Sequence, residues 1–230
     1  MLYSDCYDNT LFQSMELHRI EATLSPKYSY QGKVTLDHRR TVLEWLRDVS
    51  AEWETSFQAL VLGCDLVDRA LGTSQFTNIR LGKLQLLGLT CLWIATKFHA
   101  VYPVKIINLV HLCPENEDEV KSTTVLESNC LWMYSKEDFL LMEQLLANAL
   151  HFDFRGVTIL RYLEARHVEA IQAFAIQEKI WESILSTDMV INSNYDMAER
   201  ISSDMRKNPK RQKRVLGSVH EGLPLSFPVE

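Results

Sequence analysis

Apolar residues recur at helical spacing through most of residues 36–154. In the first such stretch five positions would form one helical stripe: Val42, Trp45, Leu46, Val49 and Trp53. Thr35 stands where it could cap this helix, and Ser135 with Asp138 is typical of the cap of a later one. No convincing alternation of apolar and polar residues predicts a strand. The pattern therefore predicts an all-α fold.

The stretch 81–98 is apolar on nearly every face. A helix of this kind is packed on all sides, so we expect it at the centre of a five-helix domain. Its last turn contains Lys97, an ammonium group at the end of a buried helix. The helix macrodipole favours a cation at that position, but packing alone does not explain it.

Composition divides the chain into four stretches. Residues 1–35 hold one polar helix near 10–22, and residues 36–154 hold the five-helix domain. Residues 155–186 are helical by composition. Residues 187–230 are polar and basic, and we expect a flexible tail there.

Charge and cysteine content narrow the class of protein. The 230 residues are 47% apolar and carry a net charge of −6, which argues against a chain that binds nucleic acid along its whole length. We find no signal-peptide pattern and no apolar run long enough to span a membrane. The five cysteines lack CxxC spacing. We interpret them as reduced thiols of a soluble intracellular protein, with Cys64 and Cys91 in the core.

Known catalytic motifs are absent from the sequence. It contains no GxGxxG, GxxxxGK[ST], GxSxG or HExxH, and its histidines and cysteines lack metal-ligand spacing. We therefore expect no cofactor and no metal, and a binding module rather than an enzyme. A helical enzyme with unrecognised chemistry stays open; it would need a cavity with convergent polar groups.

Four blocks occur in the order of the cyclin box and resemble it: HRRTVLEWLRDVSAEW (38–53), LVDRAL (66–71), GKLQLLGLTCLWIATKFHAVYP (82–103) and FLLMEQLLANALHFDF (139–154). They are most similar to the A- and B-type cell-cycle cyclins. The resemblance implies a five-helix domain that binds and activates a cyclin-dependent kinase during the cell cycle. It also implies a regulatory subunit without chemistry of its own.

The resemblance assigns a role to the lysine that ends the central helix. In cyclins this lysine and a glutamate of the fifth helix together hold backbone groups of the kinase; here they are Lys97 and Glu143. The alternative is that the two merely pair with each other or face solvent. Four apolar residues match family positions that flank the pair, with plain core packing as an equal alternative: Ile94, Phe98, Phe152 and Phe154.

Two further groups of residues match family positions. Arg39 and Asp68 correspond to an internal ion pair between helices, which specifies packing. The patch by which some cyclins dock Arg-x-Leu motifs of substrates or inhibitors corresponds to His38, Thr41, Val42, Trp45 and Gln85. Because His38 and Thr41 replace methionine and isoleucine, we expect weak docking, measurable by titration calorimetry with such a peptide.

The chain also departs from the family beyond the box. The acidic region 113–134 is longer than usual, and the residues after Phe154 are too few for a second five-helix fold, so 155–186 is interpreted as a remnant of it. The run RKNPKRQKR at 206–214 has the composition of a nuclear-import signal. Its candidate residues are Lys210, Arg211, Lys213 and Arg214.

The sequence allows several interpretations of the function. We favour a cyclin that activates a kinase and is present in the nucleus and the cytoplasm, mainly in the nucleus. A cyclin-fold adaptor of the transcription-factor or pocket-protein type is a second, and a cyclin that binds a kinase without activating it is a third. The sequence names neither the kinase nor the cell-cycle stage.

Overall fold

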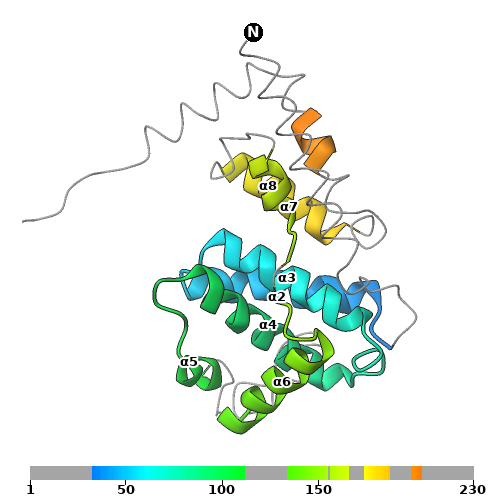
Figure 1. Ribbon diagram of the computed structural model, residues 1–230, viewed down its shortest axis with the longest axis vertical. Helices are drawn as coiled ribbons and strands as arrows, with labels where there is room; N and C mark the ends of the chain where they lie inside the picture. Colours follow the sequence, from blue (N-terminus) through cyan, green and yellow to red (C-terminus); the bar gives the residue numbers. More distant parts are fainter. Residues whose placement is uncertain (1–32, 112–133, 155, 166–173, 187–197, 204–230) are drawn as a thin grey trace, which may run out of the picture. The chain divides into compact units, whose positions relative to one another are not determined.

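The computed structural model describes residues 33–111, 134–154, 156–165, 174–186 and 198–203. Every regular element within these ranges is a helix, which confirms the all-α prediction (Figure 1). The described residues up to Gly156 form one compact unit, and those from Val157 onward form another. The boundaries predicted at 35, 154 and 186 stay predictions.

The first unit contains the five predicted helices. They are α2 (Leu36–Glu52), α3 (Phe57–Gly72), α4 (Leu84–His99, preceded by the 3-10 turn η1, Leu81–Lys83), α5 (Ile106–His111) and α6 (Lys136–Ala149). The short α5 begins three residues after Pro103.

The second unit has its own helices. They are α7 (Ile159–Ala165) and α8 (Phe174–Leu185), and residues 198–203 are also helical. Burial of an apolar face stabilises α8. Its buried side chains include Ile180, Trp181 and Ile184.

Helix α4 is enclosed by its neighbours, as predicted. It contacts α2, α3 and α6, and its side chains from Leu86 to Thr96 are buried. Two glycines allow close approach. A Cβ atom on Gly63 of α3 would lie 3.1 Å from Leu92 Cα, and one on Gly88 would lie 2.9 Å from Val42 Cγ1.

Helices α3 and α4 also place polar side chains inside this core. The Thr90 hydroxyl donates to the Leu86 carbonyl at 2.7 Å, so it does not remain unsatisfied. Cys64 and Cys91 are buried free thiols. Burial raises the pKa of both thiols far above the ordinary range, so both stay protonated and act as small apolar residues.

Side-chain caps set where two of the helices begin. Thr35 Oγ1 accepts from the backbone N–H of His38, and His38 Nδ1 accepts from the backbone N–H of Thr35. Ser135 and Asp138 form the same reciprocal arrangement at the start of α6. Each cap satisfies backbone donors that the first helical turn would leave unpaired.

A buried ion pair joins α2 to α3. Arg39 Nε donates to Asp68 Oδ1 at 2.6 Å, and Arg39 Nη2 donates to Asp68 Oδ2 at 2.7 Å. Both side chains are 1% exposed. Two parallel bonds between a guanidinium and a carboxylate fix orientation as well as distance, so this pair sets how the two helices meet.

Replacing Arg39 by alanine should lower the free energy of unfolding by about 3–5 kcal/mol, because Asp68 would stay buried without its cation. The matched double variant Arg39→Met/Asp68→Leu removes both charges and should recover most of that loss. Urea unfolding followed by circular dichroism measures both. A single variant as stable as the wild type, or a double variant no better than the single one, would contradict this account.

Candidate functional site

The end of α4 meets α6 through an ion pair. Lys97 Nζ donates to Glu143 Oε1 at 2.5 Å. The two side chains are 36% and 29% exposed, so the contact is neither core nor fully solvated. The structure therefore brings the two predicted kinase-binding residues together within the chain itself.

A tryptophan that the sequence analysis did not single out also contacts the lysine. Lys97 Nζ lies 3.5 Å from the centroid of the Trp93 ring, well within the range of a cation–π contact. Trp93 is 6% exposed, and its Nε1–H donates to the Val104 carbonyl at 2.9 Å. The signal was present in the sequence, because residues four apart on a helix share a face.

The apolar residues predicted to flank the pair differ in exposure. Phe98 is 55% exposed and Phe152 is 72% exposed, whereas Ile94 is buried in the core. Phe154 is half-buried, and its ring lies 6.2 Å from that of Phe98, centroid to centroid. Phe98, next to Lys97 in the chain, and Phe152, which follows α6, therefore expose apolar surface, whereas Ile94 belongs to the core.

The backbone conformation at Phe152 is energetically unfavourable for a residue with a large side chain. Phe152 has a φ angle of 59°, in a left-handed region that few residues other than glycine, asparagine, aspartate and histidine adopt, and His151 before it has a φ of 52°. The Phe152 N–H donates to the Ala147 carbonyl, which closes the end of α6. The chain thus holds a large apolar side chain in solvent at the cost of backbone strain, a combination found at functional surfaces.

An open groove of about 430 Å³ lies beside the pair. Trp93, Val104 and Leu140 contribute apolar surface to it, and Lys97 lies among the lysines that line it. The groove has no cluster of acidic and nucleophilic groups.

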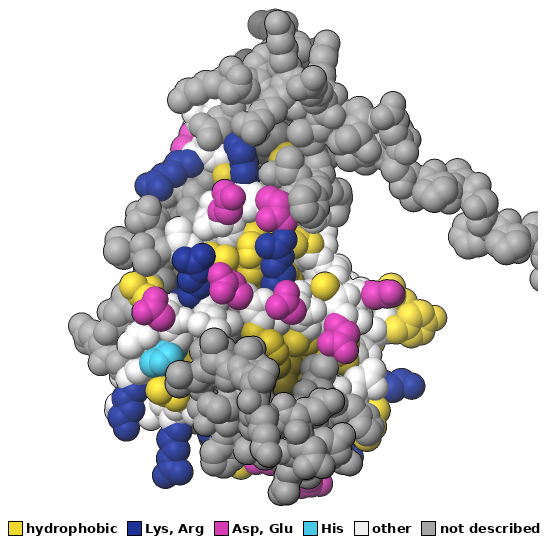
Figure 2. Space-filling model, turned by 180° about the vertical axis from the view of Figure 1, so that it is seen from behind, with side chains coloured by type: hydrophobic (Ala, Val, Ile, Leu, Met, Phe, Trp, Pro, Cys, Tyr) yellow, Lys and Arg dark blue, Asp and Glu magenta, His cyan; other side chains and the backbone are white. Residues whose placement is uncertain are grey.

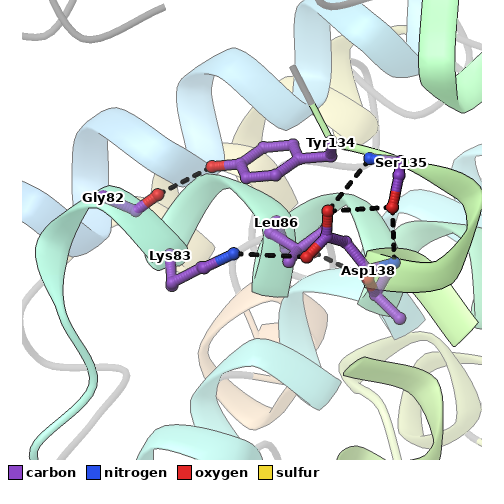
Figure 3. A network of polar contacts seen from close by, with 7 residues as sticks. Gly82, Lys83, Leu86, Tyr134, Ser135 and Asp138 are labelled. Atoms are coloured by element: carbon purple, nitrogen blue, oxygen red, sulfur yellow. Dashed lines mark hydrogen bonds and ion pairs between the residues drawn. The ribbon is translucent and has the colours of Figure 1, made fainter. Parts of the chain in front are cut away.

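Polar contacts also join the beginnings of α4 and α6 (Figure 3). The Tyr134 hydroxyl donates to the Gly82 carbonyl at 2.7 Å, and Lys83 Nζ donates to Asp138 Oδ1 at 3.5 Å. Asp138 also accepts from the Ser135 backbone N–H at 3.0 Å. These contacts set the placement of α6 against α4, and with it the meeting of Glu143 and Lys97.

Comparison with known proteins assigns the family. The sequence model of one protein family, the N-terminal domain of cyclins, matches residues 10–155, more than half of the chain. The chain belongs to the cyclin family.

Individual relatives agree with this assignment. Over 150 residues, 64% of the chain, it is 29% identical to cyclin-A2 of Xenopus laevis. Over 160 residues, 68% of the chain, it is 30% identical to a G2/mitotic-specific cyclin-A of Hydra viridissima. The matches cover 31% and 33% of these two relatives, so the chain spans about a third of their length.

A solved structure supports the fold. A viral cyclin from herpesvirus saimiri superposes with a TM-score of 0.56 at 18% identity, covering 79% of this chain and 75% of the viral one. Together with the family match, this confirms the predicted cyclin box.

Several residues of the predicted docking patch make contacts within their own helix. His38 belongs to the cap of α2, and the Thr41 hydroxyl donates to the Asp37 carbonyl at 2.8 Å. Val42 is buried against α4, while Trp45 and Gln85 are half-buried. The polar groups at the two altered positions therefore serve their own helix. Weak docking of Arg-x-Leu motifs stays a prediction.

The described residues add two findings on other site types. They hold no group of histidine, cysteine, aspartate and glutamate side chains that could bind a metal, and no helix among them could cross a membrane. On the face drawn in Figure 2, described acidic and basic side chains are interspersed, so that face carries no continuous basic surface. The import candidates Lys210, Arg211, Lys213 and Arg214, and nearly all of the acidic region 113–134, lie outside the described ranges.

The cap of α6 should make stability depend on pH. Hydrogen bonding, first of all from the Ser135 backbone N–H, lowers the pKa of Asp138 below its usual value. A carboxyl group of this kind stabilises the fold above its unfolded pKa of about 3.9, and the contribution is lost as pH falls through the lower folded pKa.

Asp138→Ala should therefore cost about 1 kcal/mol at pH 7, the usual value of a lost cap, and progressively less below about pH 4. Glu137→Ala is the control, because it removes a carboxylate from the same turn but leaves the cap intact. Urea unfolding between pH 2.5 and 7 measures both variants. An Asp138→Ala penalty that is independent of pH would rule out the charged cap.

Proposed function

We propose that this cyclin is the regulatory subunit of a cyclin-dependent protein kinase, which it binds as a heterodimer and activates. The supporting observation is the ion pair of Lys97 and Glu143, whose side chains are 36% and 29% exposed, with the exposed Phe98 next to Lys97 in the chain. An ammonium group donates hydrogen bonds and a carboxylate accepts them. The pair can therefore hold a carbonyl and an N–H of a partner backbone at the same time.

The free energies of the two sets of contacts favour replacing the Lys97–Glu143 ion pair by hydrogen bonds to the partner. An ion pair with this much exposure contributes about 1 kcal/mol or less in the free chain. Charged hydrogen bonds that become desolvated in an interface typically cost about 2–5 kcal/mol when one partner is removed. Exposed apolar side chains such as Phe98 would exclude water around these bonds.

Activation would follow from binding one conformation of the kinase better than another. Docking against the kinase C-helix would hold that helix inward, which keeps the lysine–glutamate pair of the kinase in place for phosphoryl transfer. The cyclin would contribute no catalytic group. A kinase assay separates this proposal from a cyclin that binds without activating, and the absence of any kinase from a pull-down would favour the adaptor alternative.

Lys97→Ala and Glu143→Ala should each weaken kinase binding and activation by well over tenfold, because each leaves a desolvated group of the partner unpaired. The melting temperature should change little, since the internal pair contributes so weakly. A kinase pull-down with a histone-kinase assay, run beside a thermal melt, measures all three properties.

The matched control is the exposed pair Arg40 and Glu44 on α2, whose Nε and Oε1 atoms lie 2.9 Å apart. Arg40→Ala and Glu44→Ala remove a surface ion pair without touching α4 or α6, so binding should stay at the wild-type level. If Lys97→Ala binds as well as the wild type, or melts much earlier, the kinase interface lies elsewhere.

We also propose that residues 206–214 direct this cyclin to the nucleus, with a remaining cytoplasmic pool. The supporting observation is six basic residues among nine. Replacing Lys210, Arg211, Lys213 and Arg214 by alanine should shift a fluorescent fusion toward the cytoplasm. Unchanged nuclear accumulation would mean that the run is a solvated tail or that import depends on the kinase.

A further inference from the structure

Two different contacts hold the Lys97 ammonium group. Glu143 accepts one of its hydrogen bonds, and the face of the Trp93 ring lies beneath it. A lysine side chain has several rotatable bonds and loses much rotamer freedom when it is fixed. Both contacts impose that loss in the free chain, so a partner would meet a lysine that is already placed.

The two contacts respond differently to a partner. The Glu143 contact takes up one N–H of the ammonium group and the Oε1 atom of the carboxylate, so it competes with a partner for both. The Trp93 contact joins the ammonium group to a ring face and takes up no hydrogen-bond acceptor that a partner would use. It can therefore persist after Glu143 has turned to the partner, and it strengthens when water is excluded.

Trp93 is itself held firmly. Its side chain is 6% exposed, and its Nε1–H is tied to the Val104 carbonyl in the segment between α4 and α5. The orientation of the ring is thus set by the core on one side and by this hydrogen bond on the other. A ring fixed in this way presents its face to Lys97 in one position.

We infer that Trp93 is a positioning residue of the partner-binding site, which holds the Lys97 ammonium group where it meets the kinase. This inference rests on the proposed function. It assigns to Trp93 a role beyond filling the core. It also accounts for a large aromatic side chain one helical turn before the lysine.

The test compares Trp93→Phe with Trp93→Leu. Both variants lose the Nε1–H donor and some volume, but only phenylalanine keeps a ring face under Lys97. Trp93→Leu should bind the kinase about fivefold more weakly than Trp93→Phe, the factor expected for a modest cation–π contact. In a Lys97→Met background the two variants should bind alike, because the cation is gone.

A second measurement needs no kinase and covers the case in which Trp93→Leu folds poorly. In lysine-labelled protein, the ε-methylene signals of Lys97, assigned with Lys97→Arg, should be shifted upfield by the ring in the wild type and in Trp93→Phe. The shift should vanish in Trp93→Leu. Wild-type signals at the usual position of a solvated lysine would overturn the inference.

The outcomes also separate this inference from the proposed function. If Lys97→Ala loses kinase binding while Trp93→Phe and Trp93→Leu bind equally well, Trp93 has no positioning role and the proposed interface stands. If Lys97→Ala binds as the wild type does, both the interface and the role of Trp93 are wrong. A Phe-over-Leu preference that depends on Lys97 supports both.

Discussion

The enclosure of α4 is the constraint on which the rest of this cyclin depends. Its side chains from Leu86 to Thr96 are buried, and glycines at 63 and 88 let α3 and α2 approach it closely. Because its neighbours fix the helix on all sides, the position and direction of its C-terminal end are fixed as well. Its last turn therefore presents Lys97 and Phe98 from a rigid base, as a binding surface requires.

Polar contacts between helices specify this arrangement more than they stabilise it. A buried pair such as Arg39 and Asp68 offsets its own desolvation only through good geometry, and apolar substitutes often do as well. The pair does, however, restrict α2 and α3 to one relative placement. Two further contacts restrict α4 and α6 in the same way. Tyr134, just before α6, bonds to Gly82 before α4, and Lys83 pairs with Asp138 of α6. These contacts therefore favour one geometry for the surface that carries Lys97 and Glu143.

Local chemistry made much of the fold predictable. The caps at Thr35 and Ser135, the apolar stripe of α2 and the all-round burial of α4 follow from residue type and spacing alone. Contacts between distant segments did not follow, because they depend on how the helices cross. Ile94 and Phe98 looked equivalent in the sequence, yet one is buried and the other exposed. Lys97 and Glu143 are 46 positions apart, and only the crossing of α4 and α6 brings them together.

We propose that Lys97 and Glu143 bind a partner and do not only pair with each other. The direct test is the reversed pair Lys97→Glu/Glu143→Lys, measured for melting temperature and for kinase affinity. The opposite charges would still meet across α4 and α6, so the variant should melt close to the wild type. Each group would then face a partner group of the wrong polarity, and kinase binding should fall by well over tenfold. A reversed pair that binds the kinase as tightly as the wild type would show that the two residues act only within the chain.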